Sequence, residues 1–399
     1  MTIAATPSGA HGAASARATN RLPSLDVLRG LAVAGMILVV SPGDWNMAYA
    51  PLKHAPWNGW TLADMVFPTF LFSVGLAISL SLTALARDKR ATAAKITRRV
   101  LALISLGLVL NALPYFDLAH LRLPGILQRI ALCYALAVTL CLATARIGPD
   151  GRAMVNQPAL LAAIAVILLG YWAALAWVPV PGIGAGHLDP GGSLPSWIDR
   201  GVFTVPHLWP YGTDATGAVV YDPEGLLSTL PAIVNVLVGV LAGTALKASQ
   251  SRLPLLVAAV LLIGAGLTLD PVLVVNKQIW TSSFALFSGG FSLGVLAILS
   301  ALLDRGPAAL PRALTFPFRV LGGNAILAFT LSQILSAIGG VPVIASADGA
   351  ITPQAWGDRL AKAVIDDPYL ASFACALGIL GLVVLALLPL HRRGLHVRL

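Results

Sequence analysis

A histidine and an aspartate stand ten residues apart where a long apolar segment of this chain begins. His54 lies in the stretch Lys-His-Ala-Pro-Trp-Asn-Gly-Trp, and Asp64 lies in the first turn of the segment that follows. An imidazole can change charge near neutral pH, and a carboxylate inside an apolar span is costly unless it has a role. These two residues therefore predict a site of proton exchange at one end of a hydrophobic helix.

Two roles are open for Asp64. A carboxylate near a helix N-terminus is stabilised by the helix dipole, so Asp64 can simply cap the helix. Alternatively, it orients the His54 imidazole or holds the amino group of a substrate. Residue types and spacing fit both roles equally well.

Gln128 and Arg129 form a second polar pair inside an apolar segment, Leu-Pro-Gly-Ile-Leu-Gln-Arg-Ile. An arginine flanked by apolar residues on a spanning helix normally faces the bundle interior and has a partner. That partner is either a protein carboxylate or a bound anion such as a phosphate, which a guanidinium fork suits. Arg98 and Arg99, where the preceding span begins, could receive another part of the same anion, although loop charge also explains them.

The composition places these residues in a membrane protein. Hydrophobic residues make up 57% of the chain and charged residues only 11%, against roughly 25% charged residues in soluble domains. The apolar runs last about twenty residues, which fits spanning helices better than barrel strands. We expect an all-α polytopic membrane protein with about ten transmembrane helices in one bundle, near residues 25–42, 62–85, 97–113, 124–144, 157–178, 226–247, 253–270, 279–303, 317–338 and 369–390.

The domain organisation follows from these spans. Residues 1–20 are rich in Ala, Ser and Thr and predict a disordered cytoplasmic tail. Residues 21–399 form one membrane domain without an internal repeat, and the Gly-, Pro- and Trp-rich link 179–225 predicts an external loop. The three cysteines fall inside apolar spans without metal-type spacing, so we expect core residues and no metal site: Cys133, Cys141 and Cys375.

The basic residues indicate the orientation. Eighteen Lys and Arg residues fall in loops on the N-terminal side, and the opposite loops hold only Lys53, Arg122, Arg200, Lys277, Arg359 and Lys362. Cytoplasmic loops carry the excess of positive charge, so both termini are predicted in the cytoplasm. The net charge of +9 is therefore topological and does not indicate nucleic-acid binding. His54 and Asp64 then lie at the outer face.

Several motifs together resemble the heparan-α-glucosaminide N-acetyltransferase family, including its short bacterial members. The most specific is His-Ala-x-Trp-x-Gly at His54 followed by Asp-x-Val-Phe-Pro at Asp64, and Gly-x-Leu-Gln-Arg also matches. The resemblance runs in order over roughly residues 21–340, and its remaining marks are Asp222-Pro-Glu224-Gly225, Asn276-Lys277-x-x-Trp280 and Gly322-Gly-Asn324.

This resemblance implies an enzyme of the bacterial inner membrane that transfers acetyl from cytoplasmic acetyl-CoA to an amino sugar of the glucosamine type at the outer face. His54 would act as a general base or as a transient acetyl acceptor, and the sequence leaves both mechanisms open. Gln128 and Arg129 would border the CoA site, with Arg98 and Arg99 towards the nucleotide. The family also implies a homodimer and a set of substrate-binding residues: Trp57, Asn58, Asp222, Glu224, Asn276, Lys277 and Asn324.

One position departs from the family pattern. Family members commonly carry an asparagine at the end of the first span, where this chain has Val40-Ser41-Pro42-Gly43. Either Ser41 substitutes as the group that stabilises the acetyl carbonyl, or no side chain does so. A membrane O-acyltransferase of a glycan or lipid is the first alternative, because Ser-Leu-Asp-x-Leu-Arg-Gly at residues 24–30 is shared more widely. A secondary transporter is the second, although no inverted repeat supports it.

The charge asymmetry generates a testable topology. Single cysteines introduced at positions 88 and 200 of a cysteine-free variant should react differently with a membrane-impermeant maleimide in intact cells. We expect labelling at position 200 and none at position 88, because the basic loop should face the cytoplasm. The reverse pattern would invert the topology.

Overall fold

The computed structural model describes residues 22–149, 151–304, 310–346 and 349–397. The predicted disordered tail, residues 1–20, lies outside this range. The described chain is almost entirely helical, and its strands form two short antiparallel hairpins, β1 (Arg146–Ile147) with β2 (Ala153–Met154) and β3 (Ile344–Ser346) with β4 (Gly349–Ile351). The prediction of an all-α polytopic membrane protein is confirmed.

Each predicted span coincides with a helix. The helices are α2 (Pro23–Val40), α3 (Val66–Ala86, preceded by the 3-10 turn η3, Ala63–Met65), α4 (Lys89–Ala112), α5 (Ile126–Thr144), α6 (Gln157–Trp177), α8 (Thr229–Ala248), α9 (Leu253–Thr268), α10 (Ser282–Leu303), α11 (Arg312–Gly323) with α12 (Ala325–Gly339), and α14 (Pro368–Arg392). Shorter helices are η2 (Ala50–Leu52), α7 (Leu194–Phe203), η4 (Val205–His207) and α13 (Pro353–Lys362).

The ten predicted spans differ in whether their helices are long and apolar enough to cross a membrane. Within the described residues, seven helices are long and apolar enough to cross a membrane, and the number is eight if α11 and α12, bent by 86°, form one span. The other two predicted spans are α4 and α9. Helix α9 has 16 residues, about 24 Å, which is short of the roughly 30 Å hydrocarbon core. Helix α4 begins eight residues before its predicted start, in a basic segment where Asp88 caps it by accepting from the Ala91 N–H.

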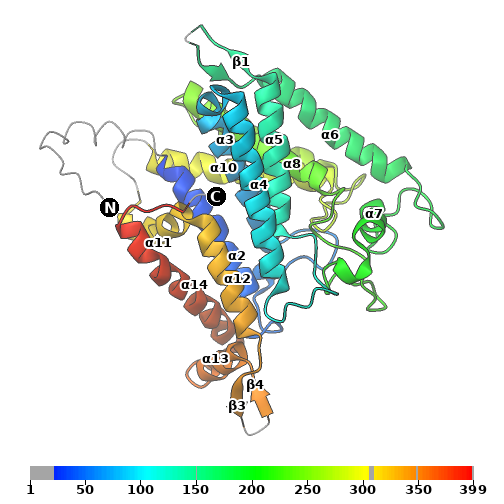
Figure 1. The fold of residues 1–399 in the computed structure, drawn as a ribbon, viewed down its shortest axis with the longest axis vertical. Helices are drawn as coiled ribbons and strands as arrows, with labels where there is room; N and C mark the ends of the chain where they lie inside the picture. Colours follow the sequence, from blue (N-terminus) through cyan, green and yellow to red (C-terminus); the bar gives the residue numbers. More distant parts are fainter. Residues whose placement is uncertain (1–21, 150, 305–309, 347–348, 398–399) are drawn as a thin grey trace, which may run out of the picture.

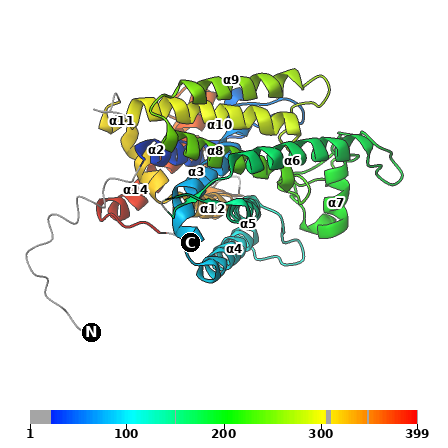
Figure 2. The same ribbon diagram turned by 90° about the horizontal axis from the view of Figure 1, so that it is seen from above.

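The centre of the bundle is α3 packed against α8. Both helices are 78% buried over their apolar windows, whereas α6 and α14 are only 17% buried and lie at the periphery (Figure 1). Seen from above, α9 and α10 lie on one side of this centre and α4 and α5 on the other (Figure 2). A Cβ at Gly75 would come within 1.8 Å of the Val236 carbonyl oxygen, so the two backbones approach too closely for any other residue.

The helix order places different segments of the chain at the two ends of the bundle. Helices α2 and α3 are joined by the loop that carries His54, so the end of α2 and the start of α3 meet there. The first turn of α2 lies at the opposite end, where a Cβ at Gly322 would meet the Asp26 carbonyl oxygen at 1.8 Å. The 18 residues of α2 separate these ends by about 27 Å.

Candidate active site

The His54 imidazole is held by Asp64. The Nδ1 atom of His54 lies 2.7 Å from Asp64 Oδ1, and the side chain of Asp64 is fully buried while that of His54 is 39% exposed. The other Asp64 oxygen accepts from the Ala55 N–H at 3.1 Å, the Thr61 N–H at 2.9 Å and the Thr61 hydroxyl at 3.1 Å. The Asp64 carboxylate, in the turn η3 before α3, thus holds the His54 loop in place through these hydrogen bonds.

This geometry sets the chemistry of the imidazole. A carboxylate accepts hydrogen bonds only, so Nδ1 carries the proton and Nε2 presents a lone pair. The pKa of His54 is lowered below its usual value, first by the Lys277 ammonium and then by burial, while Asp64 opposes the shift. A neutral imidazole at pH 7 is therefore the favoured state, which is the state that can accept a proton or attack an acyl group.

Lys277 lies far along the chain from His54, in the loop before α10, and this loop is bonded to the His54 loop. Gly59 donates its N–H to the Val275 carbonyl at 2.8 Å, and Asn276 Nδ2 donates to Asn58 Oδ1 at 3.1 Å. Asn276 also accepts from the Ile279 N–H, which shapes the turn before α10. The structure therefore brings three of the predicted substrate-binding residues, Asn58, Asn276 and Lys277, to the His54 loop.

The long loop 179–225 also meets this site. Trp57 donates its Nε1–H to the Leu188 carbonyl at 2.8 Å and packs edge-on against Tyr221, with ring centroids 4.8 Å apart. The loop contains α7, whose buried Asp199 accepts from the Leu226 N–H at 2.8 Å. Burial raises the pKa of Asp199 to about 7. The sequence analysis did not single out Asp199, since its burial depends on the fold of this loop.

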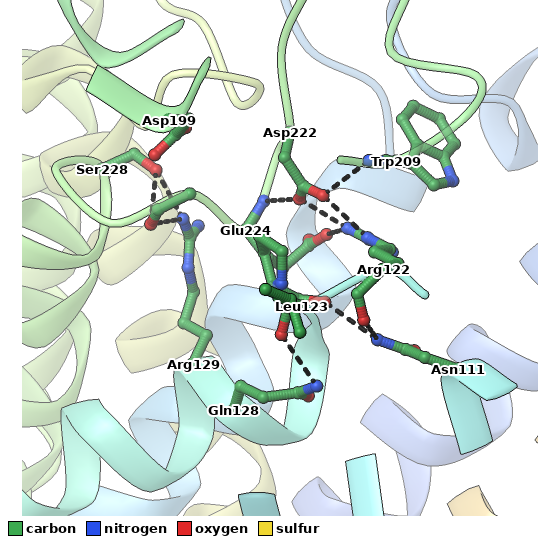
Figure 3. A network of polar contacts seen from close by, with 12 residues as sticks. Asn111, Arg122, Leu123, Gln128, Arg129, Asp199, Trp209, Asp222, Glu224 and Ser228 are labelled. Carbon is green, nitrogen blue, oxygen red and sulfur yellow. Dashed lines mark hydrogen bonds and ion pairs between the residues drawn. The ribbon is translucent and has the colours of Figure 1, made fainter. Parts of the chain in front are cut away.

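Asp222 and Glu224 both bind Arg122, which the sequence analysis counted only among the basic residues of the loops. Arg122 donates from Nε to Asp222 Oδ2 at 2.8 Å, from Nη2 to Asp222 Oδ1 at 2.6 Å, and from Nη2 also to Glu224 Oε2 (Figure 3). Asp222 further accepts from the N–H groups of Trp209 and Glu224, both at 2.9 Å. Arg122 lowers the pKa of Glu224, and the two carboxylates raise the pKa of Arg122.

These contacts give Asp222 and Glu224 different roles. Asp222 has four donors around it and a fully buried side chain, so its main contribution is to hold loop 113–125 against the start of α8. Glu224 is one of the charges that act on His54, together with Lys277 and Asp64. Glu224 is therefore the one that acts electrostatically on the imidazole.

Arg129 lies in the first turn of α5 and is 1% exposed. Its Nη2 donates to the Gly225 carbonyl at 2.9 Å and to the Ser228 hydroxyl (Figure 3). Its guanidinium lies 5.2 Å from the centre of the Trp280 ring. Within the described residues, Nε and Nη1 of Arg129 have no hydrogen-bond partner. Neither partner of Nη2 is a carboxylate, so part of the guanidinium is left available.

Gln128 packs between α4 and α5. Its Nε2 donates to the Leu123 carbonyl at 3.2 Å, and a Cβ at Gly107 or Gly125 would come within 2.2 Å or 2.8 Å of its Oε1. Ser41 ends α2 with its hydroxyl buried and without a hydrogen-bond partner among the described residues. No hydrogen bond in this part of the chain joins Ser41 to His54, so the structure leaves its proposed role untested.

A cavity of about 460 Å³ lies at the end of the bundle opposite His54. Asp26, Arg29 and Arg99 line it together with the α11–α12 junction, and Arg99 also stacks 4.3 Å over the Tyr134 ring. Arg98 is exposed on α4, and neither Gln128 nor Arg129 is among the lining residues. Arg29 was missed as a candidate because it lies in Ser-Leu-Asp-x-Leu-Arg-Gly, the motif that is shared beyond this family.

An apolar constriction separates the cavity from the His54 end. A void of about 10 Å³, room for one water molecule at most, is lined by Met36, Phe67, Phe70, Ile126, Leu127, Ile130, Ile326 and Phe329. Phe70, Ile130 and Ile326 line the cavity as well. Phe67 packs edge-on against Trp280 with centroids 5.6 Å apart, so the constriction adjoins the Arg129 environment.

Asn324 is separated from the other predicted substrate-binding residues. It lies at the break between α11 and α12, beside the cavity-lining Gly322 and Gly323. Its side chain contacts the C-terminal tail, by a bond from Nδ2 to the Leu395 carbonyl and one to Oδ1 from the Val397 N–H. The position of Asn324 in the motif did not indicate this, since the 86° bend is a tertiary feature.

The fold and these charges define a polytopic helical membrane protein with a His–Asp pair at one end and a basic cavity at the other. The chain matches a family model described as heparan-alpha-glucosaminide N-acetyltransferase, catalytic, over residues 21–264. It is 31% identical to human heparan-alpha-glucosaminide N-acetyltransferase over 328 residues, which are 71% of this chain and 49% of the human protein. The mouse protein of the same name is 31% identical over 329 residues, 71% of this chain and 50% of its own length.

The chain therefore belongs to the heparan-α-glucosaminide N-acetyltransferase family, and the resemblance seen in the motifs is confirmed. It spans about half the length of the two relatives that it matches. The matched region contains His54, Asp64, Arg129 and Glu224. The α11–α12 junction and the C-terminal tail lie beyond the part that the family model covers.

The electrostatics of His54 generate a paired prediction. Lys277→Gln should raise the pKa of His54, because it removes the largest influence that disfavours the imidazolium, and Asp64→Asn should lower it, because it removes the charge that favours the imidazolium. NMR titration of ¹⁵N-histidine-labelled protein, assigned with a His54→Gln variant, measures both shifts. A shift in the same direction for the two substitutions would contradict this description of the site.

Proposed function

We propose that this protein is a transmembrane N-acetyltransferase that uses acetyl-CoA on the cytoplasmic side to acetylate an amino sugar of the glucosamine type on the outer side. The observation that carries the proposal is the hydrogen bond between His54 Nδ1 and a buried Asp64, which leaves Nε2 of a neutral imidazole as the reactive atom. The names of the two relatives supply the reaction class.

The chemistry at His54 follows from the free Nε2. In direct transfer, Nε2 takes the proton of the sugar amine as its nitrogen attacks the thioester carbon, and the CoA thiolate leaves. In double displacement, Nε2 itself attacks the thioester, the CoA thiolate leaves, and the amine then removes the acetyl group from the imidazole. Asp64 serves both routes, because it fixes the tautomer and stabilises the positive charge that develops on the ring.

The acceptor would bind on the outer side of His54. Trp57 and Asn58 belong to the His54 loop, and Asn276 and Lys277 to the loop bonded to it. Glu224 supplies the carboxylate for a protonated amine, and Asp222 supports this end by fixing Arg122. Lys277 keeps the imidazole neutral, so the amine can give up its proton at pH 7.

The donor would enter the cavity at the other end. Arg29 and Arg99 line that cavity and suit the phosphates of CoA, with Arg98 on the exposed face nearby. The slender acyl arm would then pass the constriction of Phe67, Phe70 and Ile326 to reach His54. Such a route moves an acetyl group across the bilayer without moving CoA. A closed apolar constriction between turnovers would prevent the passage of protons and ions.

Arg129 lies on this route near the His54 end, since α5 begins there. Its Nε and Nη1, which have no hydrogen-bond partner in the described part of the chain, can bind an oxygen of the donor arm, with Gln128 positioning the turn. The proposal treats residues 21–399 as one membrane domain that holds both ends of this route. In the proposed orientation, both termini lie in the cytoplasm of a bacterial cell and His54 faces outward.

The central test is acetyl transfer by purified protein from labelled acetyl-CoA to a panel of amino sugars, with hydroxyl acceptors as controls. His54→Ala should keep acetyl-CoA binding, because an exposed loop side chain contributes little packing, and should lower turnover by about 10²–10⁴-fold. His54→Gln should be equally impaired, since glutamine keeps size but cannot take the proton. Near wild-type transfer by His54→Ala would refute the proposed mechanism.

Ser41→Ala in the same assay tests the missing asparagine. A loss of about ten-fold or more in turnover would make the buried Ser41 hydroxyl the group that stabilises the acetyl carbonyl. Unchanged turnover would leave that role to a backbone N–H or to Arg129.

Arg129 is tested by donor binding. Arg129→Met should weaken acetyl-CoA binding by about ten-fold or more, because a lost charged hydrogen bond costs about 1.5–3 kcal/mol, and should leave the KM for the amino sugar unchanged. Arg129→Lys, the matched control, keeps the charge but loses the planar fork, so an intermediate affinity is expected. Unchanged donor affinity in a folded Arg129→Met protein would assign Arg129 to packing alone.

A further inference from the structure

The chain turns back into the bundle after its last helix. Helix α14 ends at Arg392, and Gly394 adopts φ +64, the left-handed conformation typical of a helix C-terminus. The Gly394 N–H donates to the His391 carbonyl and the Leu395 N–H to the Leu390 carbonyl. The tail therefore leaves α14 along a defined path, which Figure 1 shows as the red trace towards α11.

Asn324 holds this tail on both sides of one residue. Its Nδ2 donates to the Leu395 carbonyl at 3.2 Å, and its Oδ1 accepts from the Val397 N–H at 2.8 Å. The Asn324 side chain is buried, so release of the tail would leave a donor and an acceptor unpaired inside the protein. The carboxamide thus fixes the backbone of His396 as a neighbouring strand would.

The fixed residue lines the cavity. His396 and Val397 are among its lining residues, together with Arg29, Arg99 and Asp26. The volume of about 460 Å³ lies within the usual range of small-molecule sites, roughly 300–1,000 Å³. The tail is therefore one wall of a cavity whose lining also carries two arginines, one aspartate and two serines, Ser73 and Ser81.

We propose that His396 and Val397 form part of the donor site and that His396 contacts the phosphate-bearing half of the acyl-CoA beside Arg29 and Arg99. This inference rests on the proposed function, since it takes acetyl-CoA as the donor. Its basis is the cavity wall and the Asn324 clamp, which hold His396 at the basic end rather than in solvent. It also assigns Asn324 to the donor end as a positioning residue, not to the acceptor end where its motif suggested it.

A tail that only stabilises the fold and a tail that binds the ligand lead to different experimental predictions. If the tail only caps the bundle, loss of its contacts would lower stability and affect all ligands alike. If His396 meets the phosphates, its loss would affect ligands that carry phosphates and spare those that do not. Pantetheine, which has the acyl arm without the nucleotide and phosphates, separates the two cases.

The experiment uses the purified full chain and isothermal titration with CoA and with pantetheine. His396→Ala should raise the Kd for CoA by about ten-fold, a loss of 1.4 kcal/mol, and leave the Kd for pantetheine and the KM for the amino sugar unchanged. Asn324→Ala should raise the Kd for CoA at least as much, because it frees the tail that carries His396. Leu395→Ala is the matched control, since the Leu395 side chain is half exposed and does not line the cavity.

Two results would overturn the inference. Unchanged CoA binding by His396→Ala, with a wild type that binds CoA, would remove His396 from the donor site. An equal loss for CoA and pantetheine, with a lower Tm, would make the tail structural. If Asn324→Ala does not fold, His396→Ala still decides the question, because it keeps both bonds of the clamp. Absence of CoA binding to the wild type would instead refute the proposed donor, and the inference with it.

Discussion

The arrangement of the His54 end depends on one buried carboxylate. A charged group at the start of an apolar helix is stable only when its lone pairs are used, and Asp64 meets this condition with four donors. Three of these come from Ala55 and Thr61, so the carboxylate closes the loop and the fourth bond orients His54. The same burial that makes Asp64 costly makes the position of the imidazole reproducible.

Two buried arginines, Arg122 and Arg129, have different kinds of partner. Arg122 is neutralised by Asp222 and Glu224, a pairing that joins residues 100 and 102 positions apart and holds two loops together. Arg129 receives a carbonyl, a hydroxyl and the face of Trp280, and two of its N–H groups lack hydrogen-bond partners in the described part of the chain. A buried cation without a direct carboxylate partner is costly in a folded protein, and a ligand oxygen would reduce that cost.

The separation of the two ends follows from simple helix geometry. Helix α2 spans about 27 Å, and its two ends contact different parts of the chain: Asp26 meets the α11–α12 junction, while the loop after α2 carries His54. Between them the side chains are large and apolar, as at Phe67 and Phe70. This constriction keeps the exposed His54 site at one end of the bundle apart from the basic cavity at the other. A reaction that connects the two ends requires the constriction to open.

The sequence by itself determined the class of protein, the approximate positions of the helical segments and the candidates His54 and Asp64, because hydropathy, helix period and short-range spacing are local properties. Only the tertiary structure decided that Asp64 bonds to His54 and which distant groups interact: Arg122 with Asp222, Lys277 with His54, and Asn324 with the C-terminal tail. These pairings depend on how closely helices approach and where they bend. Such properties arise from contacts between segments and have no signature in any one segment.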